Sequence, residues 1–250
     1  MDLGLEGRVV LVTGAAGGIG TATARALAAE GCRLVLADLR RPDVEGLDPD
    51  RTLAVAADVT DEVSVAAAVG AAGRRFGGLD GVVGCHGVSG PVGTPLDEVP
   101  ADRWRHVLDV NATGSFLLLR AAAPLLRRGR DGVVVLVASD SALVAAPGMA
   151  PYCASKAAVL QLARAASVDL APDVRVVAVC PSVVDTPMSR GDLGVDAGAA
   201  GGFDGAGFPV QRPEEVAAAV TYLCSPLARA VNGTALLSDF GYGARSGFPA

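Results

Sequence analysis

The sequence predicts an α/β fold, a doubly wound sheet of about seven parallel strands flanked by helices on both faces. Short apolar runs rich in Val and Leu alternate along the chain with Ala-rich runs at helical spacing. Strands that are apolar on both faces are typical of parallel sheets buried between two layers of helices. Right-handed crossovers then give the doubly wound arrangement. The 250 residues contain no internal repeat and no interdomain linker, so we expect a single domain spanning residues 1–250.

The first two expected strands enclose a glycine-rich turn and a helix. Residues 8–12 form a short apolar run that ends at glycines, as a buried strand does before a tight turn. Residues 18–30 are Ala-rich with helical spacing, and residues 33–37 form a second apolar run that ends at Asp38. This order predicts the first parallel pair of the sheet, because parallel neighbours need a crossover helix between them.

The middle of the chain continues the alternation. Residues 53–57 and 81–83 are apolar runs of strand length, and an Ala- and Val-rich helix is expected between them at 61–76. A long helix is predicted over residues 101–127. Pro124 lacks the amide hydrogen that a helix interior uses, so we expect it to kink or end this helix.

The last part of the chain supplies three more strands. Residues 133–137 predict the fifth strand, residues 174–180 the sixth and residues 234–237 the seventh. A helix is expected over 151–171, and another should begin at Pro213, because proline suits the first turn of a helix.

The segment 188–210 is irregular and rich in glycine. Its glycines are Gly191, Gly194, Gly198, Gly201, Gly202, Gly205 and Gly207. Two interpretations remain open: a disordered surface insertion, or a mobile flap that closes over a pocket. The two are compatible if the flap becomes ordered on binding.

Composition and charge exclude several classes of partner. The net charge of −6 gives no reason to expect nucleic acid or an anionic membrane. No apolar run approaches the roughly 18 residues of a membrane span, and the first residues lack the pattern of a signal peptide. Five cysteines form no C-x-x-C pair, which indicates free thiols in a reducing cytoplasm and predicts no metal site.

A glycine-rich loop follows the first expected strand and opens the first expected helix. Gly14, Gly18 and Gly20 allow the backbone to turn sharply and to approach a pyrophosphate. The helix amino terminus offers free N–H groups and partial positive charge to that anion. The loop therefore predicts a dinucleotide site in a Rossmann-type fold.

The end of the second strand bears on which dinucleotide is bound. Asp38 lies 18 residues past Gly20, where a carboxylate can accept hydrogen bonds from the adenosine ribose and repel a 2′-phosphate. Arg40 and Arg41 could neutralise a phosphate, yet the glycine loop itself carries no basic residue. NAD is therefore favoured over NADP.

The single lysine of the chain is Lys156, four residues after Tyr152, whereas the other twenty basic residues are arginine. A position that keeps lysine in such a sequence is expected to need a compact ammonium rather than the planar fork of arginine. Residues four apart share one face of a helix.

The spacings Gly14-x-x-x-Gly18-x-Gly20 and Tyr152-x-x-x-Lys156 together resemble the short-chain dehydrogenase/reductase family. The resemblance is to its shorter, single-domain branch and covers essentially the whole chain. Asn111 on the long helix and Ser139 at the end of the fifth strand match further family positions. The resemblance implies cofactor contacts from Gly14, Gly17, Gly18, Ile19, Gly20, Asp38, Leu39, Asp58, Val59, Cys85, His86, Gly87, Asn111, Tyr152, Lys156, Pro181, Val184 and Thr186.

The resemblance implies four catalytic residues. Tyr152 is expected to act as general acid and base, and the Lys156 ammonium should lower its pKa from the usual value of about 10. Lys156 would also donate to the nicotinamide ribose, and Ser139 would orient the substrate oxygen. Asn111 would hold a water that links Lys156 to solvent.

Three places depart from the family pattern. Gly84-Cys85-His86-Gly87 stands where Asn-Asn-Ala-Gly is usual, so we expect His86 to fill space or bond a backbone group. The alternative is that it contacts substrate or tunes the Tyr152–Lys156 pair. Ser182 replaces a usual glycine, and Phe240 replaces another, where it is expected to pack at a subunit contact.

The function expected is hydride transfer between NAD and a secondary alcohol or ketone. The alternatives are an NADPH-dependent carbonyl or ketoacyl reductase, and, in a different class, a non-catalytic regulator that binds the dinucleotide. Substrate contacts are expected from Ser139, Asp140, Met149 and Ser182 in a mostly small and apolar pocket. The resemblance implies a homotetramer or homodimer.

Overall fold

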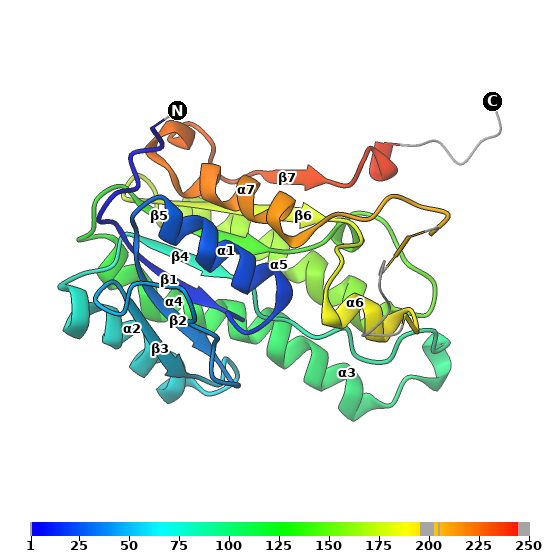
Figure 1. The fold of residues 1–250 in the computed structure, drawn as a ribbon. Helices are drawn as coiled ribbons and strands as arrows, with labels where there is room; N and C mark the ends of the chain where they lie inside the picture. Colours follow the sequence, from blue (N-terminus) through cyan, green and yellow to red (C-terminus); the bar gives the residue numbers. More distant parts are fainter. Residues whose placement is uncertain (1, 196–202, 205, 245–250) are drawn as a thin grey trace.

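A computed structural model of the chain describes residues 2–195, 203–204 and 206–244. Within them, seven parallel strands form one sheet in the order β3-β2-β1-β4-β5-β6-β7 (Figure 1). The strands are β1 (Val9–Thr13), β2 (Arg33–Asp38), β3 (Thr52–Ala56), β4 (Gly81–Gly84), β5 (Gly132–Val137), β6 (Val174–Pro181) and β7 (Ala235–Ser238). The predicted strands are confirmed, with ends that shift by at most one residue.

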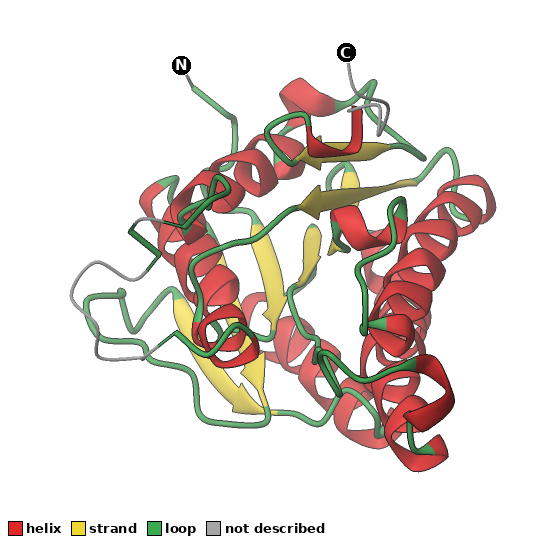
Figure 2. Cartoon of the chain, turned by 90° about the vertical axis from the view of Figure 1, so that its right-hand side faces the viewer, coloured by secondary structure: helices red, strands yellow, loops and turns green. Residues whose placement is uncertain are grey.

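Helices cover both faces of the sheet, as Figures 1 and 2 show. The long helices are α1 (Gly18–Ala29), α2 (Glu62–Phe76), α3 (Ala101–Leu108), α4 (Gly114–Leu126), α5 (Ala150–Asp169) and α7 (Pro213–Cys224), with a short α6 (Pro187–Asp192). Helices α1 and α7 pack together on one face, whereas α2, α4 and α5 cover the other.

Alternation along the strands divides the apolar core into two halves. Val9 and Leu11 of β1 pack with the α2, α4 and α5 side, whereas Val10 and Val12 pack with the α1 and α7 side. Successive strand residues point to opposite faces, so a strand that is buried on both sides is apolar throughout. This explains the continuous Val and Leu runs of the sequence.

The predicted helix over 101–127 is interrupted. A π-helical turn at Asp109–Thr113 separates α3 from α4. Pro124 lies inside α4, which ends two residues later at Leu126, so it falls in the last turn. The π turn holds Asn111 and is the reason that one helical pattern becomes two elements.

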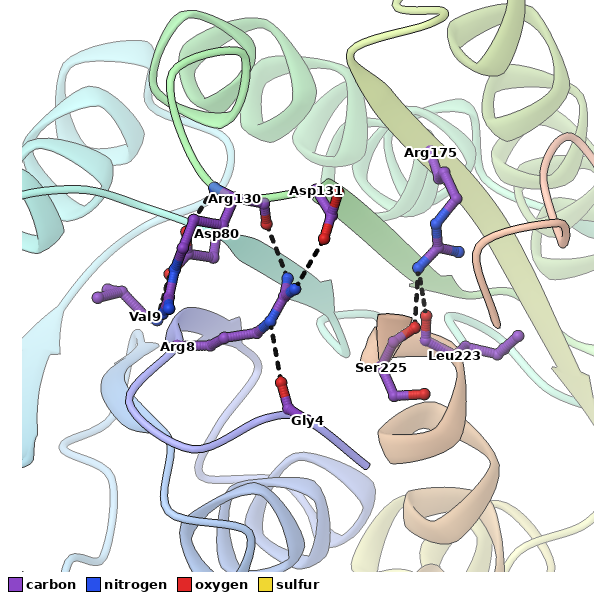
Figure 3. A network of polar contacts seen from close by, with 9 residues as sticks. All are labelled: Gly4, Arg8, Val9, Asp80, Arg130, Asp131, Arg175, Leu223 and Ser225. Carbon is purple, nitrogen blue, oxygen red and sulfur yellow. Dashed lines mark hydrogen bonds and ion pairs between the residues drawn. The ribbon is translucent and has the colours of Figure 1, made fainter. Parts of the chain in front are cut away.

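The amino-terminal ends of the strands are joined by polar contacts (Figure 3). The buried Arg8 guanidinium donates to the carbonyls of Gly4 (3.2 Å) and Arg130 (2.7 Å) and to the Asp131 carboxylate (3.0 Å). These bonds connect the start of β1 to the loop before β5.

The buried Asp80 and the partly buried Arg175 extend this network. Asp80 accepts from the amides of Val9 (2.9 Å) and Arg130 (2.8 Å). Arg175 on β6 donates to the carbonyl of Leu223 at the end of α7 (3.0 Å). The amino-terminal edge of the sheet is therefore closed by structural contacts, which leaves the carboxyl edge for binding. No helix in the described part of the chain is long and apolar enough to cross a membrane.

Candidate active site

One large cavity, of about 690 Å³, opens at the carboxyl ends of the strands. In an open parallel sheet this edge is where ligands bind. All the expected cofactor, catalytic and substrate residues line it except Asn111, which lies buried beneath it. Residues as distant in sequence as the glycine loop and Thr186 thus meet in one place.

The glycine loop forms a tight cradle at one end of the cavity. Gly14 has a φ of +67°, and a Cβ there would lie 2.5 Å from the amide nitrogen of His86. A Cβ on Gly18 would lie 2.8 Å from Cγ2 of Thr186. Neither position has room for a side chain, which allows a ligand to approach the backbone.

The amino terminus of α1 is open to an anion. Its N-cap, Gly17, makes no side-chain capping bond, and the first turn contains no acidic residue. The first amides of a helix have no partner inside the helix and attract negative charge. The chain's own residues here fit the pyrophosphate of a dinucleotide.

Asp38 holds the glycine loop against β2. Its Oδ2 accepts from the Ala16 amide (3.0 Å), and its Oδ1 accepts from the Arg40 amide (2.9 Å). The Arg40 side chain reaches back to the Ala16 carbonyl at 3.4 Å. A carboxylate and a guanidinium therefore lie side by side at this end of the cavity.

Asp58 lines the cavity beyond Asp38. Its carboxylate accepts from the Thr60 hydroxyl (2.7 Å) and amide (2.9 Å), and these bonds lower the pKa of Asp58. Leu39 is exposed at this end of the cavity, and Val59 packs near Gly114.

Tyr152, Ser139 and Lys156 come together at the other end. The Lys156 nitrogen lies 5.6 Å from the centroid of the Tyr152 ring and donates to the Val137 carbonyl at 2.9 Å. Ser139 donates to the Asp140 carboxylate (3.0 Å) and accepts from the Ser141 amide (3.1 Å). Strand β5 and helix α5 hold the three side chains on one wall.

The expected pKa of Tyr152 is wrong for this structure. Burial raises the pKa of Tyr152 to about 12, and the carboxylates of Asp140 and Asp192 add to this rise, although a hydrogen bond with Ser139 opposes it. Burial also lowers the pKa of Lys156 to about 8. Desolvation is the largest cause of both shifts, because both groups lose water on the same wall.

Asn111 joins three elements through its amide side chain. It accepts from the Val88 amide (2.8 Å) and donates to the Val88 carbonyl (3.0 Å) and to the Ser155 hydroxyl (2.8 Å). Its own carbonyl accepts from the Ser115 hydroxyl (2.7 Å). Ser155 precedes Lys156, so the π turn is tied directly to the lysine's position on α5.

His86 bonds two side-chain hydroxyls and no backbone group, which corrects half of our expectation. Nδ1 lies 2.7 Å from the Thr13 hydroxyl, and Nε2 lies 3.3 Å from that of Ser115. Ser115 donates its proton to the Asn111 carbonyl at 2.7 Å, whereas the contact of the Thr13 hydroxyl with the Val83 carbonyl is long, at 3.5 Å. We therefore assign the ring hydrogen to Nε2, with Nδ1 accepting from Thr13. Burial, with Lys156 nearby, lowers the pKa of His86 to about 3.

The segment after β6 closes the cavity. Pro181 and Ser182 line it, and Thr186 caps α6 through the Ser189 amide (3.2 Å). The expected flap of 188–210 is only partly described: residues 188–195, 203–204 and 206–210 are visible, and the others lie outside the described residues. Asp192 on α6 accepts from the Ser89 hydroxyl at 2.5 Å.

Several residues of this site were missed from the sequence. Ser115 carries no motif signal. Thr13 and Ser155 stand next to Gly14 and Lys156, but their contacts with His86 and Asn111 could not be predicted, because these partners are far away in the chain. Asp192 was included only within the flap. The described residues contain no group of three His, Cys, Asp or Glu side chains placed to hold a metal ion.

Comparison with known proteins decides the family. Residues 14–243 match the family model described as enoyl-(acyl carrier protein) reductase, which spans the glycine loop and the Tyr152–Lys156 pair. The chain is a short-chain dehydrogenase/reductase. The resemblance inferred from the sequence is confirmed.

Relatives of this short-chain dehydrogenase/reductase are alcohol dehydrogenases and ketone reductases. It is 39% identical to cis-4-hydroxycyclohexanecarboxylate dehydrogenase of Sinomonas cyclohexanicum, over 94% of this chain and 96% of the relative. Ligand-free aldohexose dehydrogenase of Thermoplasma acidophilum has a TM-score of 0.89 at 29% identity, over 98% of each chain.

A third comparison bears on the cofactor. The structure of 3-ketoacyl-(acyl-carrier-protein) reductase from Brucella melitensis complexed with NADH has a TM-score of 0.85 at 32% identity, over 96% of this chain and 99% of the other. This short-chain dehydrogenase/reductase is therefore an oxidoreductase that uses a nicotinamide cofactor and acts on a secondary alcohol or the matching ketone.

Proposed function

We propose that this short-chain dehydrogenase/reductase transfers hydride between NAD and a secondary alcohol, with Asn111, Ser139, Tyr152 and Lys156 as its catalytic residues. The observation that carries the proposal is the placement of Ser139, Tyr152 and Lys156 on one wall of the cavity that also contains the glycine loop. Whichever direction dominates in the cell, the same wall serves oxidation and reduction.

A bound nicotinamide would supply or accept the hydride, and the chain's own residues would move the proton. Tyr152 gives its hydroxyl proton to a ketone oxygen, or takes one from an alcohol. Ser139 holds the same oxygen beside Tyr152. Because burial raises the pKa of Tyr152 to about 12, it is protonated at neutral pH and ready to reduce a ketone. Oxidation should therefore accelerate as pH rises.

Lys156 and Asn111 support Tyr152. The Lys156 ammonium, held by the Val137 carbonyl, faces the Tyr152 ring and stabilises the phenolate that forms when the proton leaves. We also assign to Lys156 a hydrogen bond to the nicotinamide ribose. The Asn111 side chain donates to Ser155 and so helps to fix the position of Lys156 on α5. We assign to the Asn111 main-chain carbonyl the binding of a water that links Lys156 with solvent.

NAD is the cofactor that Asp38 favours. Its carboxylate lines the cavity where the adenosine ribose of a Rossmann-type fold lies, and it would repel a 2′-phosphate. The contact of Arg40 with the Ala16 carbonyl supports the alternative, an NADPH-dependent carbonyl or ketoacyl reductase. The argument from Asp38 for NAD is stronger than the argument from Arg40 for NADPH, because two backbone amides fix the Asp38 carboxylate whereas the Arg40 side chain is exposed.

We further propose a single domain over residues 1–250, with 188–210 as a flap over the substrate end. A homodimer or homotetramer is supported by apolar side chains exposed around β7: Leu236, Leu237 and Phe240. Phe240 has a φ of +54° and is half exposed. The cysteines are free thiols, which suits the cytoplasm.

The test is absorbance at the reduced-nicotinamide band across a panel of secondary alcohols, with NAD and NADP compared. We expect reduction of NAD with at least one alcohol, and Tyr152→Phe should lose this turnover while still binding NADH. A clear preference for NADP would overturn the argument from Asp38. Full turnover by Tyr152→Phe would overturn the catalytic assignment.

A further inference from the structure

The substrate end of the cavity combines apolar walls with two carboxylates. Val92, Val144 and Met149 supply apolar lining. Asp140 and Asp192 line the same space, and both are half-buried. Both act on the pKa of Tyr152, so both lie close enough for their charge to reach the reacting oxygen.

Neither carboxylate has a cationic partner among the described residues. Asp140 accepts from the hydroxyls of Ser139 (3.0 Å) and Ser141 (3.5 Å), and Asp192 accepts from that of Ser89 (2.5 Å). These donors are neutral. Two negative charges thus lack a cationic partner in a half-buried setting, where charge effects are stronger than in water.

The nearby basic side chains are held elsewhere. Arg190, two residues before Asp192, makes two contacts with the Asp185 carboxylate (2.5 and 2.9 Å). Lys156 is buried and donates to the Val137 carbonyl. Three other basic residues line the cavity. Arg40 lies beside Asp38 and His106 acts on Asp58, both at the cofactor end. His86 is buried and its pKa falls to about 3, so it carries no charge at neutral pH.

The part of the flap sequence that follows Arg190 adds no positive charge. Between Arg190 and Arg212 the chain contains no Lys, Arg or His, but it contains Asp192, Asp196 and Asp204. These residues therefore include no cation that could pair with a carboxylate, sulfonate or phosphate.

We infer that the substrate pocket selects against anions, and that Asp140 and Asp192 determine this specificity. The substrate is a secondary alcohol, or its ketone, on an apolar frame without an acidic group. An ammonium on that frame raises kcat/KM. This inference rests on the proposed function. It separates this chain from the relative named for cis-4-hydroxycyclohexanecarboxylate, whose printed substrate is an acid.

The test uses three cyclohexanols that differ mainly in charge at the 4-position: the carboxylate, the carboxamide and the aminomethyl compound. We measure kcat/KM with NAD at neutral pH. The amide should exceed the acid by roughly tenfold or more, because one unit charge close to an uncompensated carboxylate is worth at least a decade. The amine should equal or exceed the amide. An acid that is used as well as the amide overturns the inference.

Two isosteric variants test whether Asp140 and Asp192 cause the selection against anions. Asp192→Asn and Asp140→Asn keep an oxygen that can accept from Ser89 and from Ser139, respectively, but remove the charge. Each should raise the acid-to-amine ratio of kcat/KM several-fold. Asp102→Asn, an exposed site on α3 that is not among the cavity residues, is the matched control and should leave the ratio unchanged. Equal ratios in all four proteins would remove both aspartates as determinants.

Binding measurements distinguish a failure of this inference from a failure of the proposed function. If no alcohol is oxidised, the proposed function fails, and calorimetry of the same three compounds with the NADH-loaded protein decides the charge selection. Tighter binding of the amine than of the acid, weakened by Asp192→Asn, still supports the inference. Equal binding, or no binding of the amine, overturns it.

Discussion

At the scale of single residues, the ammonium of the single lysine lies in confined surroundings. Lys156 is buried on α5, and its nitrogen is held by the Val137 carbonyl at 2.9 Å. A Cβ at Gly87 would lie only 3.3 Å from that nitrogen. The surroundings fit a compact ammonium and leave little room for a planar guanidinium.

Lys156→Arg should therefore keep the charge and lose most activity. We expect kcat to fall by about 10²-fold or more, as when a proton-transfer group is disturbed. Steady-state kinetics with an alcohol substrate provide the measurement. Arg164→Lys, on an exposed part of the same helix, is the control and should keep its activity. Near-full turnover by Lys156→Arg would show that the argument from residue shape is wrong.

A second prediction at the residue scale concerns His86 and the loss of folding stability at acidic pH. The pKa of His86 is about 3 in the folded chain and about 6.5 when unfolded. The unfolded state therefore binds more protons between these values, and stability due to neutral His86, present above pH 6.5, is lost as pH falls toward 3. Denaturant unfolding should show a loss of about 1 kcal/mol or more between pH 6.5 and pH 5.

His86→Ala should flatten this slope, whereas a substitution at the exposed His106 should leave it in place. The same variant tests the link from His86 through Ser115 to the Asn111 carbonyl. A changed pH profile of kcat/KM would support a role in positioning the catalytic wall. An unchanged slope would contradict the assignment of a buried neutral imidazole.

At the scale of elements, the glycine loop is the joint between β1 and α1. Gly14 needs a φ of +67°, and a Cβ there meets the His86 amide nitrogen at 2.5 Å. Gly17 has a φ of −85°, and a Cβ there meets only the Gly14 carbonyl, at 3.3 Å. Two glycines three residues apart thus differ in what they tolerate.

Gly14→Ala should lower the free energy of unfolding by about 1–3 kcal/mol, because the side chain is strained and collides with backbone. It should also abolish NADH binding, followed by fluorescence titration. Gly17→Ala should cost less in both measurements. Equal losses would show that crowding against the ligand, rather than strain in the loop, is the cause.

Sequence patterns were sufficient for the elements that depend on periodicity and insufficient for those that depend on distant partners. The Val-rich strands and the Tyr152–Lys156 pair follow from spacing along the chain. The π turn at Asn111 does not, because it depends on Val88, Ser155 and Ser115, which only the fold brings close. Burial of Tyr152, which reverses its expected pKa shift, is likewise a property of the fold.

At the scale of the whole molecule, the two ends of the sheet have different roles, one structural and one in binding. Arg8, Asp80 and Arg175 close the amino-terminal end with buried and partly buried hydrogen bonds, whereas the carboxyl end is open as the cavity. The sheet also has two edge strands, β3 and β7, and β7 is only partly covered. Edge strands with apolar side chains favour association with another chain.

Phe240→Asp should shift the protein toward a smaller species in analytical ultracentrifugation, because a carboxylate would be buried at the contact. Val63→Asp is a matched control: Val63 is 75% exposed on α2, on a different part of the surface. It should leave the sedimentation unchanged. A monomeric wild-type protein, or a variant of unchanged size, would contradict a contact through β7.

Asp38 has a consequence for anyone who wishes to re-engineer the coenzyme preference. Each of its carboxylate oxygens is used by one backbone amide, that of Ala16 or that of Arg40. Asp38→Asn keeps a single acceptor oxygen, and Asp38→Ser has a shorter side chain with one hydroxyl. Removing the charge to admit a 2′-phosphate thus also loosens the turn that must cradle the pyrophosphate. A successful exchange needs a second substitution that secures the Ala16 amide.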